Sequence, residues 1–503
     1  MWTIGRRVLL FAVLALWCAA GRAQVQAPEP HSTIEIDAAA PSHPFPHFWE
    51  EMFGSGRAIL SLREDYRQDL REVHQITGFQ YVRFHAILHD EVGVYDEDGN
   101  GKPVYNFSYV DQIYDGLLAA GVKPFVEVSF MPNKLAASEH FQPFWYKPDV
   151  SPPKDWTKWD ALITAFVEHL IERYGVDEVA SWYFEVWNEP NLDFWAGDPK
   201  QATYFQLYDH TAAAIKKVNA RLRVGGPATA QAAWVDVFIG HCAQNHIPVD
   251  FVSTHVYAND TSADVFHTNE NIPRDQMVCR AVRKVHDQIA ASENPHLPLI
   301  WSEFNASYKN EPDVTDSIYM GPWLAETVRQ CDGLVDMMSY WTFSDVFEEQ
   351  GVVKTPFYGG FGLMAEDSIP KPAFDAFQLL HKLGDRRLTL NSDSALLTRD
   401  QHGSLVIAVW NYDAPDEAGR AREITLLFKN MNAKHASIWR VDSDHGDFHA
   451  AYAKMHEPRY PTQAQILQLR AAAQIPPPEN LELHNGRLTL RIPPHGLALI
   501  EVK

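Results

Sequence analysis

Short apolar runs alternate with amphipathic stretches between residues 47 and 382. The apolar runs predict strands at His47–Phe53, Tyr81–Ile87, Lys123–Phe130, Trp182–Trp187, Arg223–Pro227, Phe251–Tyr257, Leu299–Phe304 and Met337–Phe343. Between them lie stretches with helical periodicity, among them Trp156–Tyr174, Ala202–Asn219, Asp275–Ser292 and Tyr319–Cys331. A strand followed by a helix, repeated about eight times, predicts an α/β fold of the (β/α)8 TIM-barrel type.

The pattern changes after Lys382, where short alternating runs are separated by polar turns. We expect strands at Arg387–Leu390, Ser404–Trp410, Glu423–Phe428, Ser437–Val441, Leu481–Leu483 and Arg487–Ile492. Residues 383–503 therefore predict a C-terminal antiparallel β-sandwich domain after a barrel at 47–382. The run Thr33–Ile36, within the segment 24–46, is expected to join that sandwich as an extra strand.

The first 23 residues have the features of a secretory signal peptide. Arg6 and Arg7 precede an apolar run from Val8 to Ala20, and Gly21 to Ala23 provide a small-residue cleavage site. The apolar run is shorter than the roughly 20 residues of a membrane span, which disfavours the alternative of an uncleaved anchor. We therefore expect an exported protein, periplasmic or secreted, with no membrane association once the signal is removed.

The amino-acid composition and net charge limit the classes of binding partner that we expect. Hydrophobic residues make up 46% of the 503 residues, enough for a large core, and the formal net charge is −22. A surface this acidic repels polyanions, so nucleic acid and anionic membranes are not expected partners. A neutral substrate is favoured over a strongly anionic one.

Cysteines and acidic loops give no clear signal for a metal or cofactor. Cys242, Cys279 and Cys331 remain after the leader, so at most one disulfide is possible, and buried free thiols are the favoured interpretation. The segment Asp96–Gly101 has the spacing of half a calcium loop, but Phe107 occupies the position of the required Glu. We predict no metal and no cofactor.

The strongest local motif is Trp187-Asn188-Glu189-Pro190, at the end of the fourth predicted strand. A carboxylate at a strand end, beside an amide side chain, suits a general acid that meets a glycosidic oxygen while Asn188 holds a hydroxyl. The alternative is a glutamate that caps the next helix, because helix N-termini favour acidic side chains.

A second glutamate closes the seventh predicted strand in Trp301-Ser302-Glu303-Phe304-Asn305. A charge that ends an apolar strand is costly to bury unless it is paired or functional. A salt-bridged structural glutamate is the alternative. Because strand ends of a barrel face one cavity, Glu189 and Glu303 together fit the two carboxylates of a retaining glycosidase, which lie about 5–5.5 Å apart.

Motifs beyond these glutamates resemble glycoside hydrolase family 39 and, within it, the β-xylosidases. The resemblance runs from about His47 to the C-terminus and includes Trp49–Ala58, Arg83-Phe84-His85, Thr254-His255-Val256-Tyr257 and Tyr340–Glu349. It implies that Glu189 is the acid/base, that Glu303 is the nucleophile and that Asn188 contacts the sugar 2-hydroxyl.

The resemblance also implies a subsite for the terminal sugar, lined by His85, Phe130, His255, Tyr257, Tyr308, Trp341 and Glu349. Aromatic rings stack on sugar faces, whereas His, Tyr and Glu bond hydroxyl groups. Tyr308 or His255 is a candidate to orient the nucleophile. Glu348 and Glu349 are adjacent, so a regular strand directs only one of them inward, and the sequence leaves open which one contacts sugar.

The function that this resemblance implies is an exo-acting β-D-xylosidase that releases xylose from xylo-oligosaccharides with retention of configuration. An α-L-iduronidase-like or α-L-arabinosidase activity is the alternative on the same scaffold, although Glu348 and Glu349 would repel the iduronate carboxylate. An alternative of another class is a non-catalytic carbohydrate-binding protein. The sequence leaves the oligomeric state open, with a monomer preferred.

Overall fold

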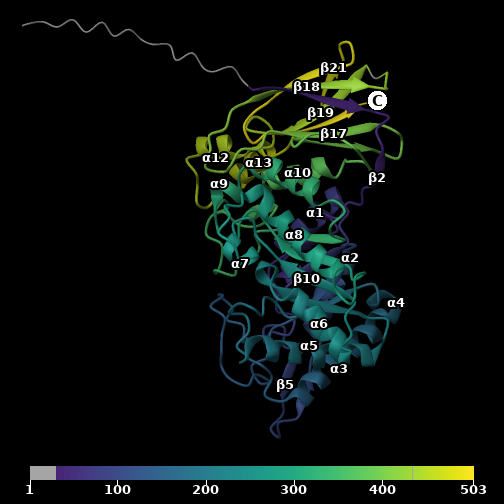
Figure 1. The fold of residues 1–503 in the computed structure, drawn as a ribbon. Coiled ribbons are helices and arrows are strands. Elements are labelled where there is room, and N and C mark those ends of the chain that lie inside the picture. Colours follow the sequence, from purple (N-terminus) through teal and green to yellow (C-terminus); the bar gives the residue numbers. More distant parts are fainter. Residues whose placement is uncertain (1–29, 433, 503) are drawn as a thin grey trace, which may run out of the picture.

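The computed structural model describes residues 30–432 and 434–502, which form a barrel with a β-sandwich packed at one end (Figure 1). The predicted signal peptide lies outside the described residues, and its removal stays a prediction. Within the part of the chain that is described, no helix combines the length and apolar character needed to cross a membrane.

The barrel is closed by eight parallel strands, which confirms the predicted (β/α)8 fold. Around the barrel they are β3 (Met52–Gly54), β4 (Tyr81–Phe84), β7 (Lys123–Val128), β8 (Tyr183–Val186), β9 (Arg223–Thr229), β10 (Phe251–His255), β11 (Leu299–Phe304) and β12 (Met337–Tyr340). Most are short and buried on both faces, as in β11, where every residue is buried. Continuous apolar runs follow from this burial, because helices cover the outside of the barrel.

One major helix follows each barrel strand. They are α1 (Glu64–Thr77), α2 (Ser108–Ala119), α3 (Trp156–Tyr174), α5 (Lys200–Val218), α6 (Val235–Asn245), α8 (Arg274–Ala290), α10 (Met320–Cys331) and α11 (Pro372–Leu380). The start of α3 is fixed by Asp155, whose carboxylate accepts hydrogen bonds from the amides of Thr157 and Lys158. The predicted bounds of α3 agree with the structure, and those of the other three named helices differ by two residues or fewer.

Shorter elements lie in the connections between barrel strands and helices. They are η1 (Ala58–Leu62), β5 (Tyr95–Glu97), β6 (Pro103–Tyr105), α4 (Val176–Val179), η2 (Ala230–Ala232), α7 (Ser262–Phe266), α9 (Pro312–Thr315), β13 (Met364–Ala365), η3 (Glu366–Ser368) and β14 (Ile369–Pro370). Strands β5 and β6 form a hairpin whose turn is closed by Asp98, which accepts from the amides of Asn100 and Lys102. The acidic segment considered as a calcium loop is therefore a polar turn.

The sandwich consists of a seven-stranded and a three-stranded sheet. The larger sheet contains, in order, β2 (Ser42–Pro44), β15 (Arg386–Leu388), β16 (Ala395–Arg399), β17 (Leu405–Trp410), β22 (Leu497–Val502), β19 (His435–Val441) and β20 (Glu479–Glu482). The smaller sheet contains β1 (His31–Asp37), β18 (Arg422–Lys429) and β21 (Arg487–Ile492). Apolar side chains such as Ile36, Ile407 and Leu426 fill the space between the sheets.

The sandwich differs from the prediction in three respects. Strand β1 pairs parallel to β18, so the N-terminal strand does join the domain but the domain is not wholly antiparallel. Strands β2, β16 and β22 were not predicted. Two helices, α12 (His449–Lys454) and α13 (Gln463–Ala472), occupy a segment for which no element was predicted.

The cysteines correct another expectation. Cys279 on α8 and Cys331 at the end of α10 form a disulfide, with their Cα atoms 5.2 Å apart, whereas free thiols were favoured from the sequence. Adjacent helices of the barrel bring the two residues together across 52 positions of sequence, a proximity that local spacing cannot reveal. Cys242 is the remaining described cysteine and is a buried free thiol.

Candidate active site

A cavity of about 410 Å³ opens at the carboxyl ends of the barrel strands. This is the face on which (β/α)8 enzymes carry their active sites. Nine of the eleven site residues expected from the sequence line it: His85, Asn188, Glu189, His255, Tyr257, Glu303, Tyr308, Trp341 and Glu349. The two remaining expectations, Phe130 and Glu348, do not.

Glu189 stands three residues after the end of β8, in a left-handed turn with φ of +43°. Its backbone amide donates to the carbonyl of Ala228 at 2.8 Å, which ties the turn to the end of the neighbouring strand. Helix α5 begins only at Lys200, so Glu189 is not a helix cap. Burial and the nearby carboxylates of Glu303 and Asp260 raise the pKa of Glu189 well above its usual range, as a general acid requires.

Glu303 projects from β11 and is held by hydrogen bonds on both carboxylate oxygens. The Arg83 guanidinium lies 2.6 Å from Oε1, and the Tyr257 hydroxyl donates to Oε2 at 2.6 Å. Burial and the carboxyl groups of Glu303 and Glu189 raise the pKa of Tyr257 well above 10, so its hydroxyl stays a donor. The carboxylate of Glu303 is thus stabilised and oriented, as a nucleophile needs to be.

The two glutamates face each other at short range. A carboxylate oxygen of Glu189, one of Glu303 and a ring nitrogen of His255 all lie within 4.8 Å of one another. Carboxyl groups this close fit the separation of roughly 5–5.5 Å in retaining glycosidases better than the roughly 6.5–9.5 Å of inverting enzymes. A metal ion among these three atoms would lie near the positive charge of Arg83, which is paired with Glu303.

His255 links the two glutamates from β10. Its Nδ1 lies 3.1 Å from Glu189 and 3.6 Å from Glu303, and its Nε2 lies 3.1 Å from the hydroxyl of Ser302. Burial lowers the pKa of His255 well below its usual value, and Arg83 and His85 act in the same direction. A neutral imidazole therefore adjoins the acid, where it orients Glu189 without adding a charge.

Arg83 is the hub of a buried ionic network beneath the cavity. Besides Glu303, it contacts Glu185 at 2.6 Å, Glu127 at 2.7 Å and the side-chain oxygen of Asn188 at 3.0 Å. Burial opposes its charge, but the three carboxylates raise the pKa of Arg83 above its usual value. Because the Asn188 oxygen accepts from Arg83, the Asn188 amide nitrogen is the group left to donate to a bound sugar.

The wall opposite Glu189 is lined with groups that suit sugar hydroxyls. His85 places Nδ1 2.6 Å from Glu127, which leaves Nε2 directed toward Glu349 at 3.6 Å and Glu303 at 3.8 Å. Burial, Glu303 and Glu189 raise the pKa of Glu349 well above its usual value. A protonated Glu349 both donates and accepts, which matches the hydroxyl groups of a neutral sugar.

Trp341 forms the floor of the cavity and depends on a glycine. It follows β12 directly, and its ring lies over Gly54 at the end of β3, so that a Cβ at position 54 would stand 2.0 Å from Cε3 of the indole. The Arg83 guanidinium lies 5.5 Å from the centre of the ring. The motif Phe-Gly-Ser at residues 53–55 thus provides the space in which a sugar-stacking ring can lie.

Three expectations about the subsite need correction, those for Phe130, Glu348 and Tyr308. Phe130 is fully buried behind the wall, where it packs against His85 and Trp187, and so supports the site without reaching the cavity. Glu348 points away and pairs with Arg63 at 2.5 Å and Arg57 at 3.4 Å.

Position 348 has φ of +58°, so the chain is not an extended strand there, and Glu349 is the member of the pair that faces the cavity. Tyr308 lies at the rim, 45% exposed, with its ring edge-on to Tyr257. The hydroxyl that bonds Glu303 is therefore that of Tyr257.

Several residues of the site were not predicted as such. Arg83, Glu127 and Glu185 lie inside apolar strands, and their charges in Tyr-Val-Arg-Phe, Phe-Val-Glu-Val and Phe-Glu-Val were the signal that could have found them. Further lining residues come from loops: Gln142, Phe144, Leu192, Phe194, Ala230, Gln231, Asp260, Gln350 and Phe361. Their positions depend on loop conformation, for which the sequence carries no comparable pattern.

A parallel barrel with two carboxyl groups this close, one with a pKa raised by burial and one held by Arg and Tyr, defines a glycoside hydrolase of the retaining type. The model of the family described as glycosyl hydrolases family 39 matches residues 32–481, and the chain belongs to this family.

Relatives and solved structures agree with that membership. The chain is 38% identical over 468 residues to a beta-xylosidase of Geobacillus stearothermophilus, covering 90% of this chain and 92% of the relative. A crystal structure of a monomeric beta-xylosidase from Caulobacter crescentus CB15 superposes with a TM-score of 0.84 at 37% identity, covering 94% of this chain and 99% of the other. An alpha-L-iduronidase of Mus musculus is 25% identical over 244 residues, 44% of this chain and 36% of that protein.

Proposed function

We propose that this protein is an exo-acting β-D-xylosidase that releases xylose from the non-reducing end of xylo-oligosaccharides with retention of anomeric configuration. The observation that carries the proposal is the pair Glu189 and Glu303, with carboxylate oxygens within 4.8 Å in one barrel cavity. The beta-xylosidase from Geobacillus stearothermophilus, 38% identical over nearly its whole length, supports the choice of sugar.

In the first step Glu303 attacks the anomeric carbon while Glu189 protonates the glycosidic oxygen. The C–O bond to the leaving group breaks as the bond from Glu303 to the sugar forms, so the departing oligosaccharide receives the proton of Glu189. Arg83 and Tyr257 hold the nucleophile in place, and Asn188 donates to the sugar 2-hydroxyl, an interaction that strengthens in the transition state.

In the second step Glu189, now ionised, removes a proton from water. The water oxygen attacks the anomeric carbon from the face that the leaving group left, the bond to Glu303 breaks, and two inversions give net retention. The 3.1 Å contact to neutral His255 keeps the carboxyl group of Glu189 aimed at the same position in both steps.

The charge of the cavity favours a neutral sugar over iduronate. Besides the catalytic pair it contains Asp260 and Glu349, and no Lys or Arg is found among the described residues that line it. A uronate carboxylate would lie among acidic groups and find no cation to pair with. A pentopyranose such as xylose carries no such group, and an α-L-arabinopyranoside presents similar hydroxyls, so a side activity on arabinosides is part of the proposal.

The loop 142–153 favours exo action. The Trp145 amide donates to the carbonyl of Glu349 at 2.8 Å, and Gln142 and Phe144 line the cavity beside it. This contact ties the loop to Glu349, and a wall on that side would leave a sugar chain to extend toward Glu189. Export to the periplasm or medium is also part of the proposal. So is a monomeric state, which is described for the beta-xylosidase from Caulobacter crescentus.

The test is an assay of the chain from Gln24 onward on nitrophenyl glycosides, with the product anomer followed by NMR. Wild type is expected to release β-xylose first. Glu303→Ala is expected to lose at least about 10³-fold in kcat, because the covalent step disappears, and to form α-xylosyl azide when azide replaces the nucleophile. Glu326→Gln, which alters a paired carboxylate on α10 away from the cavity, serves as the matched control.

Three results would count against the proposal. An active wild type with an equally active Glu303→Ala means that the site is wrong although the class survives. Faster release of iduronate than of xylose from the corresponding glycosides selects the iduronidase alternative. Binding of xylo-oligosaccharides without turnover of xyloside, arabinoside or iduronide identifies a carbohydrate-binding protein.

A further inference from the structure

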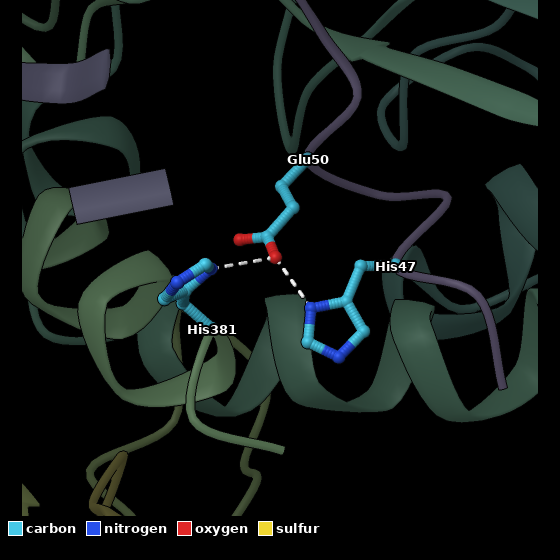
Figure 2. Close-up of side chains that lie close together, drawn as sticks. All are labelled: His47, Glu50 and His381. Carbon is cyan, nitrogen blue, oxygen red and sulfur yellow. Dashed lines mark hydrogen bonds and ion pairs between the residues drawn. The ribbon is translucent and has the colours of Figure 1, made fainter. Parts of the chain in front are cut away.

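Two histidines and a glutamate meet at the opposite end of the barrel from the active site (Figure 2). His47 and Glu50 lie in the segment that leads into β3, before its amino end, and His381 caps the carboxyl end of α11. Their ligand atoms lie within 4.8 Å of one another. His47 and Glu50 belong to the first part of the barrel, and His381 to its last helix. After this helix the chain enters the sandwich again at β15.

The hydrogen bonds of His47 require a positive species at the centre of this cluster. Its Nε2 lies 3.1 Å from the carbonyl oxygen of Leu383, which can only accept, so Nε2 carries the hydrogen. In a neutral ring Nδ1 then holds a lone pair, and this atom lies 2.5 Å from Oε1 of Glu50. Two electron-rich atoms repel each other at this distance unless a positive species, a proton or a cation that both atoms contact, holds them together.

The geometry favours a metal over a proton for two reasons. Nδ1 of His381 approaches the same oxygen, Oε1 of Glu50, at 2.9 Å, so both rings converge on one point. The other oxygen, Oε2, is buried and has no hydrogen-bond partner among the described residues. A pair of imidazolium rings leaves that oxygen unsatisfied, whereas a cation bound by the carboxylate can use both oxygens.

The donor set and its surroundings fit zinc. Two imidazole nitrogens and one carboxylate form the His2Glu set of zinc sites that keep a fourth position for water. The bond from Nε2 of His47 to a backbone carbonyl is the second contact that metal-binding histidines usually make. Ligands about 2.0–2.1 Å from zinc stand about 3.3 Å apart, so small side-chain rotations from the present 2.5 and 2.9 Å suffice.

Access and charge also suit a cation. The His381 side chain is 44% exposed, which gives a path from solvent, while that of Glu50 is only 4% exposed. Glu51 adds a second carboxyl group beside Glu50. Lys382 follows His381, but its ammonium group lies over the ring of Trp439, 5.3 Å from the ring centre.

We propose that His47, Glu50 and His381 bind a divalent zinc-like cation that fastens the entry of the barrel to its last helix. The ion would join segments more than 300 residues apart at the point where the chain passes into the sandwich. Its role is structural, since the catalytic pair lies at the other end of the strands. This cluster is not visible in the sequence, because the ligands do not form a local motif.

The test is calorimetric titration of the chelator-washed, dialysed chain with zinc chloride at neutral pH. Wild type is expected to bind one zinc per chain, and Tm is expected to rise with zinc and fall again with chelator. Cobalt should give the visible absorption of a tetrahedral site with nitrogen and oxygen ligands. His381→Ala and Glu50→Gln should each weaken zinc binding at least about tenfold, the loss that even supporting contacts of metal sites cause.

His43→Gln is the matched control, because His43 is another exposed histidine near the domain boundary and pairs with Asp332 at 2.7 Å. It should bind zinc as wild type does, and circular dichroism should show that all variants are folded. Wild type without one-to-one zinc binding would identify the cluster as a proton-linked ion pair and overturn the proposal. Zinc binding that is unchanged in folded His381→Ala would place the metal elsewhere and overturn it equally.

Discussion

The hydroxyl of Tyr257 donates a 2.6 Å hydrogen bond to Oε2 of Glu303. Arg83 occupies the other oxygen of the same carboxylate, so both oxygens are held before any sugar arrives. The two donors act differently. The positive charge of Arg83 stabilises the carboxylate, whereas the neutral hydroxyl of Tyr257 orients it. The carboxylate is therefore fixed in one plane, as the proposed attack on the anomeric carbon requires.

Tyr257→Phe is expected to lower kcat about tenfold to a hundredfold. A hydrogen bond to a charged group contributes about 1.5–3 kcal/mol, and each 1.36 kcal/mol is a factor of ten in rate. KM should change much less, because the phenyl ring keeps its place in the wall. Steady-state kinetics on nitrophenyl xyloside measure both quantities.

Tyr308→Phe is the control for this variant, since Tyr308 lies at the rim, where it is 45% exposed, and none of its recorded contacts is with Glu303. Its kcat should stay within about threefold of wild type. Equal losses of kcat in the two variants would refute the assignment of the orienting hydroxyl to Tyr257.

The proximity of Glu189 and Glu303 could be predicted from the sequence because each glutamate follows an apolar strand of a regular barrel. The carboxyl ends of all parallel strands lie at the same end of a barrel. Side chains that follow β8 and β11 are therefore expected to line the same cavity. The choice between Glu348 and Glu349 was beyond this reasoning, since the left-handed backbone at Glu348 breaks the two-residue period. Loop geometry likewise determines that the hydroxyl of Tyr257, and not that of Tyr308, bonds Glu303.

Contacts between distant segments explain most of what the sequence did not reveal. The disulfide of Cys279 with Cys331 and the cluster around Glu50 each join residues that only the closed barrel brings together. Strands β16 and β22 were missed although β17, an equally buried apolar run, was predicted, so an apolar run without a period does not by itself decide the assignment. Local patterns thus predicted the elements of the barrel, while its closure created these contacts.

Activity on natural xylo-oligosaccharides should persist well above the pH at which an ordinary glutamic acid ionises and should then fall as pH rises further. Glu189 must be protonated in the first step, and burial with Glu303 and Asp260 nearby raises its pKa well above the usual value. As pH rises through that pKa the acid form is lost, so kcat/KM should fall about tenfold per pH unit beyond it. A pH profile of kcat/KM on xylobiose measures the descending limb.

Glu189→Gln should remove this alkaline limb and lower kcat/KM on xylobiose about 10²- to 10⁴-fold. The loss in the first step should be smaller on a nitrophenyl xyloside, whose leaving group needs little protonation. Azide should yield β-xylosyl azide with this variant, the opposite anomer to that from Glu303→Ala. An alkaline limb that survives in Glu189→Gln would assign the titrating group to another residue.

Glu349 and Glu348 are expected to respond differently to substitution although they are adjacent. Glu349 faces the cavity and Glu348 pairs with Arg63 and Arg57. Glu349→Ala should lower kcat/KM on nitrophenyl xyloside about tenfold to a hundredfold, since a sugar hydroxyl loses its partner.

Glu349→Gln should recover part of that loss, because the pKa of Glu349 is raised and the group it contributes is neutral. Glu348→Gln should keep kcat/KM within about fivefold and should mainly lower Tm. A larger loss of kcat/KM in Glu348→Gln than in Glu349→Gln would reverse the assignment of the sugar contact.

The disulfide between α8 and α10 should stabilise the barrel without affecting its chemistry. It closes a loop of 52 residues, for which the loss of chain entropy in the unfolded state corresponds to about 4 kcal/mol, and native disulfides typically contribute about 2–4 kcal/mol. Cys279→Ser with Cys331→Ser is therefore expected to lower Tm by several degrees while kcat at 25 °C is unchanged. Calorimetry in the presence and absence of reductant measures the difference.

Cys242→Ser is the control, because Cys242 is a buried free thiol and reductant should lower Tm in this variant as it does in wild type. If reductant leaves the Tm of wild type unchanged, the two thiols are not paired in the folded protein and their role is only to pack the two helices together.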